Sequence, residues 1–157
     1  MSELLKPQNL KVPDWRTTHT LKTDLLGLMQ SIKTYGILYP IISMEDGTII
    51  DGYARWVIAH DMGLKEVPVT RLQCGLGEAI LLHIQMNRCR GQVVPYRLSR
   101  AIRTLLKVMS DRDIMNALNM SEDEFDILED GSLLKKRKVK QQDNNTAWIQ
   151  IESSLDI

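Results

Sequence analysis

Glycine and proline residues divide the chain into short segments, and the hydrophobic period changes from one segment to the next. Residues 23–35 carry apolar side chains at helical spacing, Gly36 follows at a C-terminal cap position, and Pro40 prevents continuation. Residues 41–44 and 48–50 have the composition of strands and flank a tight turn. This pattern predicts an α/β (α+β) fold with a small mixed sheet and covering helices.

The next segments continue the pattern. A helix is expected over about residues 52–62, where Gly63 ends it, and a third strand over residues 67–72. Pro68 favours an edge position for that strand, or the first position within it. Residues 1–20 show no period and are expected to form an extended lead-in.

The second half of the chain reads as helical. Helices are expected over about residues 76–87 and 95–109. Ser110 and Ser121 each precede an acidic residue by three positions, a capping pattern that starts a helix. Two short helices joined at residues 119–120 have the outline of a helix-turn-helix.

Composition excludes several classes of protein. The chain has 157 residues, 43% hydrophobic and 25% charged, which fits one soluble domain with a short appendage. Cys74 and Cys89 are too few for a disulfide framework, and no apolar run approaches the roughly 18 residues of a membrane span. The three histidines lack metal-ligand spacing, so no metal site is expected. Without a recognisable signal peptide, the expected location is the cytoplasm.

Charge is balanced in total, at 20 basic and 20 acidic residues, but sorted along the chain. Acidic residues are missing between Glu78 and Asp111, acids gather in residues 121–130, and a basic run follows at residues 135–138. Four basic residues of the acid-free stretch share one helix face: Arg97, Arg100, Arg103 and Lys107. This face is either a solvated surface or a contact for nucleic acid.

The most informative stretch is a strand-to-helix turn. A strand ends at Asp51, Gly52 permits a sharp turn, and Arg55 lies in the first turn of the following helix. A helix start attracts anions through its unpaired N–H groups and its dipole, and arginine adds a planar donor for phosphate oxygens. The same residues also fit a plain turn with a surface arginine, so spacing alone leaves both interpretations open.

Three motifs, taken in order, resemble one family. Residues 49–70, IIDGYARWVIAHDMGLKEVPVT, resemble the ParB N-terminal motif "IDGERRxRAAxxAGLxxVPV". Residues 31–41, SIKTYGILYPI, resemble "SIKEHGLLQPI", and Asn87-Arg88-Cys89-Arg90 resembles "ENIQR". The resemblance covers about residues 10–105. Over this range the sequence resembles the ParB/sulfiredoxin superfamily, and among its members it resembles the small IbrB-type ParB-domain proteins most.

The resemblance implies a site and a domain division. It implies that two boxes grip the phosphates of CTP or ATP, with or without Mg²⁺. The phosphate-binding residues that the resemblance implies are Gly52, Arg55, Asn87 and Arg90. Tyr53 in the turn and Arg88 in the acid-free stretch are expected to join them. The expected units are a nucleotide-binding domain at residues 1–92, a helix-turn-helix-like segment at 93–131, and a basic linker with a C-terminal strand at 132–157.

Departures from the family limit the expected chemistry. Tyr53 stands where sulfiredoxin has its catalytic cysteine, so sulfinic acid repair is not expected. Met86 replaces the glutamate of the second box, and a thioether neither activates water nor binds Mg²⁺ usefully, so turnover should be weak or absent. Asp51 is the remaining local carboxylate and the one catalytic candidate, although it fits better as a turn residue.

Two functions from different classes remain open. The favoured function is that of a nucleotide-responsive, DNA-associated or transcriptional regulator, for which the nucleoid is one candidate location. The alternative is a small phosphotransferase or nucleotidase resembling the free-serine kinases of this fold; an interaction module with a vestigial pocket is a third. DNA contacts are expected from Arg97, Arg100, Arg103, Lys107, Lys135, Lys136, Arg137 and Lys138. The acidic residues 121–130 would repel DNA, and they could instead bind a basic partner protein. A homodimer is a further alternative, and no membrane contact is expected.

Overall fold

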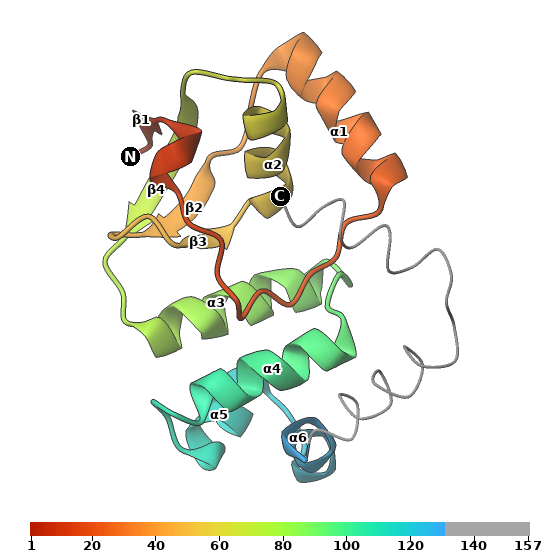
Figure 1. Ribbon diagram of the computed structural model, residues 1–157. Helices are drawn as coiled ribbons and strands as arrows, with labels where there is room; N and C mark the ends of the chain where they lie inside the picture. Colours follow the sequence, from red (N-terminus) through yellow and green to blue (C-terminus); the bar gives the residue numbers. More distant parts are fainter. Residues whose placement is uncertain (131–157) are drawn as a thin grey trace.

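The computed structural model describes residues 1–130 and has a four-stranded mixed sheet at its centre (Figure 1). The strands are β1 (Glu3–Leu5), β2 (Ile41–Met44), β3 (Ile49–Asp51) and β4 (Val67–Leu72). Their order across the sheet is β1-β4-β2-β3. The β2–β3 and β1–β4 pairs are antiparallel, whereas β2 and β4 run parallel.

Helices cover both faces of the sheet (Figure 1). On one face lie η1 (Pro7–Asn9), a short 3₁₀ helix, and α2 (Tyr53–Asp61), against which α1 (Lys22–Tyr35) packs. On the other face lies α3 (Leu76–Cys89), followed by α4 (Pro95–Leu105), α5 (Asp111–Leu118) and α6 (Glu122–Glu129). The α+β fold with a mixed sheet, predicted from the sequence, is confirmed.

Alternation along the strands produces two apolar cores. Ile41 and Ile49 pack toward α2, together with Ala59 of that helix. Their neighbours Ile42 and Ile50 point to the opposite face and join the core of α3 to α6. Successive side chains of a strand face opposite sides, so a sheet covered on both faces needs apolar residues at consecutive positions. The end of β3 is thereby held between two cores.

The first twenty residues contain a strand that the sequence did not reveal. β1 pairs antiparallel with β4, with Leu4 opposite Pro68. Both positions expected for Pro68 are therefore wrong, because β4 lies between β1 and β2 and begins at Val67, which makes Pro68 its second residue. The parallel ladder with β2 begins at Val69, so the missing N–H of proline falls just before it.

The helical half follows the predicted signals, with one shorter helix. α4 ends at Leu105 rather than near Met109, and residues 106–109 form a turn. Backbone N–H groups at Asp113 and Glu124 donate to the hydroxyls of Ser110 and Ser121, each at 3.2 Å, which confirms both N-caps.

Other predictions for this half are not decided by the structure. The residues 119–120 join α5 to α6, but a DNA-reading role for this pair stays a prediction. So does the boundary after residue 92, although α3 and α4 share one core. The basic run 135–138 and the C-terminal strand predicted within residues 132–157 lie outside the described residues. Among residues 1–130, no helix has both the length and the apolar character needed to cross a bilayer.

Candidate functional site

A cleft lies where β3 ends and α2 begins. Its walls come from the β3–α2 turn, the C-terminal part of α3, and the segment 13–20. In Figure 1 the segment before α1 passes across α3 on its way up to that helix. The cleft has a volume of about 80 Å³, which is room for several water molecules.

Gly52 makes the sharp turn into α2. Its backbone has φ of +101°, in the left-handed region that glycine adopts without strain. A Cβ atom at this position would lie 2.8 Å from Nη2 of Arg55, because the guanidinium group folds back over the glycine. Gly52 gives α2 no side-chain cap, and a helix start of this kind favours an anion.

Asp51 bridges two arginines from distant parts of the sequence. Oδ1 of Asp51 accepts a hydrogen bond from Nη1 of Arg90 at 2.8 Å. Oδ2 accepts one from Nη2 of Arg55 at 3.2 Å, and the same nitrogen lies 3.3 Å from the carbonyl oxygen of Pro40. The guanidinium groups of Arg55 and Arg90 therefore meet at one carboxylate beside the glycine turn.

The arginines keep Asp51 ionised. Its side chain is only 8% exposed, and this burial alone would raise its pKa. The hydrogen bond and charge of Arg90, assisted by Arg55, outweigh burial and lower the pKa of Asp51. At neutral pH the group is a carboxylate that holds two cations.

Arg16 contributes a third cation that the sequence analysis missed. Its guanidinium carbon lies 3.6 Å from the centre of the Tyr53 ring, and that ring stacks on Trp56 at 5.9 Å. Within residues 1–130, Nη1 of Arg16 and Nε of Arg55 are buried without a hydrogen-bond partner. Buried N–H groups without partners are costly, so both point to a ligand acceptor or ordered water. Arg16 lies in a segment without period, where local spacing gave no signal.

A neutral histidine lies beneath the cleft. The N–H of Thr17 donates to Nε2 of His83 at 2.9 Å, so that nitrogen carries no proton. Nδ1 then donates to the carbonyl oxygen of Ile50 at 2.7 Å. Burial lowers the pKa of His83 and so keeps it neutral. Asn87, also buried, donates from Nδ2 to the carbonyl oxygen of His83 at 2.7 Å.

The structure brings together five of the six residues expected to bind phosphate. Gly52, Tyr53, Arg55, Asn87 and Arg90 line the cleft. Arg88 does not, because residues two apart on a helix face different directions. Its Nη1 donates to the carbonyl oxygen of Leu118 and its Nη2 to Oε1 of Glu124, each at 3.1 Å. Arg88 thus joins α3 to the α5–α6 pair.

The charge of the cleft is not balanced by its own side chains. Arg16, Arg55 and Arg90 face a single carboxylate, Asp51, and His83 is neutral. Two positive charges are therefore in excess among the lining residues. Such a surplus in a partly enclosed site attracts anions.

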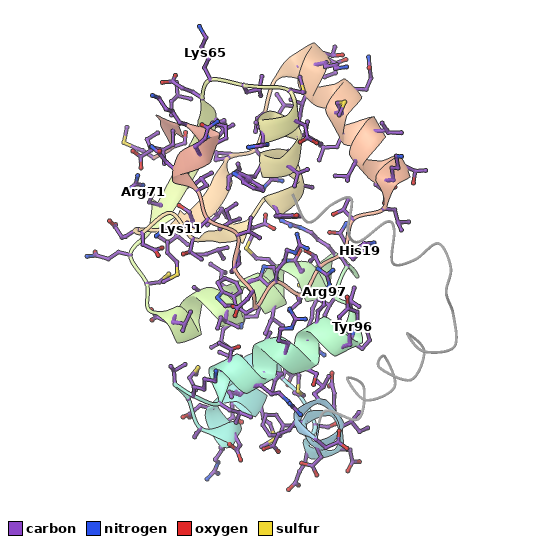
Figure 2. All side chains as sticks on the ribbon, viewed as in Figure 1. Lys11, His19, Lys65, Arg71, Tyr96 and Arg97 are labelled. Atoms are coloured by element: carbon purple, nitrogen blue, oxygen red, sulfur yellow. The ribbon has the colours of Figure 1, made fainter. Side chains whose placement is uncertain are left out.

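The basic residues of α4 have backbone partners. Nη1 of Arg97 donates to the carbonyl oxygen of Thr18 at 2.9 Å, on the side of the molecule that carries His19 (Figure 2). Nη2 of Arg103 donates to the carbonyl oxygen of Glu129 at 3.1 Å. These bonds hold the segment before α1 and helix α6 against α4, while Arg100, Arg103 and Lys107 remain exposed.

Sequence comparisons do not assign the chain to a family. No protein-family model matches the chain. A stretch of 42 residues is 50% identical to the uncharacterised protein ORF326b of Acidianus two-tailed virus. That stretch is 27% of this chain and only 13% of the viral protein.

Structural comparisons are more informative. A Pnob8-like ParB N-domain has a TM-score of 0.55 at 20% identity, over 74% of this chain and 48% of that one. The chain has a ParB N-domain fold. Truncated ParB from Caulobacter crescentus with CTP-gamma-S has a TM-score of 0.53 at 22% identity, over 80% of this chain and 74% of that one. The ParB-like fold inferred from the three motifs is thus confirmed, although the chain spans about half of the Pnob8-like structure.

Proposed function

We propose that this protein binds the phosphate of a nucleotide in the cleft and acts as a ParB-like, DNA-associated or transcriptional regulator. One observation carries the proposal. Arg55 and Arg90, 35 positions apart in the sequence, converge on Asp51 at the glycine turn. Structural relatives supply further support, because a ParB with this fold is known in complex with CTP-gamma-S.

Each part of the cleft has a role in this proposal. Gly52 allows phosphate oxygens to approach the backbone, since it carries no side chain. Arg55 and Arg90 supply charge-assisted hydrogen bonds, and Asp51 positions them before the ligand arrives. Arg16 and Tyr53 form a stacked pair at the cleft wall that orders the segment before α1.

A nucleotide panel tests the proposal. CTP, ATP, GTP and UTP are added separately and the melting temperature is measured. A ligand present at 100 times its dissociation constant adds about 2.7 kcal/mol of stability, which raises the melting temperature of a domain this size by several degrees. Arg90→Ala should reduce the shift to about half or less, whereas Arg112→Ala, an exposed arginine on α5, should preserve it. A panel without any shift would refute nucleotide binding.

DNA association is the second part of the proposal. A ParB of this fold is known in complex with the centromeric parS site. The candidate contacts of this chain are Arg97, Arg100 and Arg103 of α4 and Lys107 in the turn after it, with the 135–138 run as a further expectation. Acidic residues dominate α6, the second helix of the possible helix-turn-helix, and oppose a groove-reading role for it.

A gel-shift series over salt concentration tests DNA association. Affinity should fall linearly on a logarithmic scale with salt, with a slope of about 0.9 per phosphate contacted. Lys107→Ala should reduce that slope, and Lys65→Ala, an exposed lysine between α2 and β4, should not. A DNA affinity that does not change with salt concentration would contradict contacts between these basic residues and phosphates.

The enzyme alternative gains less support from the cleft. Both oxygens of Asp51 are engaged by arginines, and its lowered pKa makes it a weak base at neutral pH. A positioning role suits it better than a catalytic one. Steady release of inorganic phosphate from ATP or CTP, lost in Arg55→Ala, would favour the phosphotransferase or nucleotidase instead.

A further inference from the structure

The cleft is poorly built for Mg²⁺, the metal that accompanies nucleotides in many proteins. Mg²⁺ prefers octahedral oxygen ligands and usually binds through one or two carboxylates. Within the described part of the chain, Asp51 is the sole carboxylate lining the cleft. Both of its oxygens already accept hydrogen bonds from guanidinium groups, at 2.8 and 3.2 Å.

The second box offers no replacement carboxylate. Met86 stands at the position of the glutamate in the motif that this box resembles, and it is absent from the cleft lining. Its thioether is a poor ligand for a hard cation. The amide of Asn87 is buried, and its nitrogen donates to the carbonyl oxygen of His83. Its oxygen is a neutral ligand and brings no charge to balance a divalent cation.

Nearby charge also disfavours a divalent cation. Arg16, Arg55 and Arg90 all line the same small cleft, and the single carboxylate neutralises one of them. A Mg²⁺ ion there would be repelled by the remaining two charges. The arginines supply the positive charge that a metal ion would otherwise supply beside a phosphate.

We propose that the cleft binds a phosphate dianion without Mg²⁺, with Arg16, Arg55 and Arg90 supplying the neutralising charge. The inference rests on the proposed phosphate site and specifies which ionic form it takes. A phosphate monoester carries about 1.5 to 2 negative charges at pH 7, which matches the surplus of the cleft. Within residues 1–130, Nη1 of Arg16 and Nε of Arg55 are buried donors without a partner. A small rotation of either side chain would let its guanidinium group donate to a phosphate oxygen.

Calorimetric titration tests the inference with CMP, AMP and CTP as probes. Each is titrated into the full chain, once in Mg²⁺ and once in EDTA. We expect dissociation constants in EDTA within threefold of those in Mg²⁺, or tighter. A dissociation constant more than threefold tighter in Mg²⁺ would overturn the inference and leave the phosphate site standing. No binding of any probe in either buffer would refute the phosphate site itself.

Variants of Arg16 test the assignment of charge. Arg16→Ala should weaken CMP binding in EDTA by tenfold or more, because a positive charge and the donor Nη1 are lost. Arg16→Lys keeps the charge but not the planar group, so it should recover part of that loss. Arg112→Ala is the matched control and should bind as the wild type does. Unchanged CMP affinity in a folded Arg16→Ala, checked by its circular dichroism spectrum, would remove Arg16 from the site.

Discussion

Replacing Asp51 by asparagine tests the bridge at the centre of the cleft. The substitution keeps the shape of the side chain and removes its charge. Its side chain is 8% exposed, against 21% for Arg55 and 45% for Arg90. Hydrogen bonds to charged groups contribute roughly 1.5–3 kcal/mol each, less where solvent screens them, as at Arg90. We expect Asp51→Asn to lower the free energy of unfolding by about 2 kcal/mol at pH 7.

The effect must depend on pH with a definite sign. The pKa of Asp51 is lowered in the folded state, so its contribution is present above the unfolded value of about 3.9. That contribution is lost as the pH falls through the lower folded pKa. The difference between the wild type and Asp51→Asn should therefore shrink on acidification below about pH 4.

Urea unfolding at a series of pH values from 7 to 3 measures both quantities. Asp126→Asn, at an exposed position on α6, is the matched control and should change stability by less than about 0.5 kcal/mol. A destabilisation by Asp51→Asn that is equally large at pH 7 and pH 3 would refute the ion-pair account. So would a destabilisation no larger than that of the control.

Three further substitutions have expected outcomes. Gly52→Ala should cost roughly 2 kcal/mol in thermal unfolding, because its left-handed backbone strains alanine and the Cβ displaces Arg55. Arg88→Ala should lower the melting temperature through the loss of its bonds to Leu118 and Glu124, yet leave phosphate affinity unchanged in a titration. Burial lowers the pKa of His83 in the folded state, so the free energy of unfolding should fall as the pH drops below about 6.5. In urea unfolding, His83→Gln should make the free energy of unfolding less dependent on pH in this range. A variant as pH-sensitive as the wild type would contradict the assignment of His83 as neutral.

Local signals were sufficient for most of the fold. Glycine, proline and hydrophobic period mark where α1, α2 and β4 begin and end, because these signals act within a few residues. β1 was not predicted from the sequence, because a three-residue strand derives its stability from pairing with β4 and not from its own composition. The place of Pro68 also depends on the partner strand, which spacing along the chain does not contain.

The candidate site was only partly predictable for a similar reason. Gly52 and Arg55 belong to one turn, so their proximity follows from local geometry. Asp51 was interpreted mainly as a turn residue, because its role as a bridge requires Arg90 from the end of α3. Arg16 gave no local signal at all, and its position over Tyr53 is purely tertiary.

The central claim is that Arg55 and Arg90 act on the same phosphate group, and calorimetric titration of CMP into single variants tests it most directly. We predict that Arg55→Ala and Arg90→Ala each weaken binding by about 10- to 100-fold, the equivalent of about one charge-assisted hydrogen bond. Arg112→Ala should bind as the wild type does. Wild-type affinity in a folded Arg55→Ala or Arg90→Ala would contradict the claim.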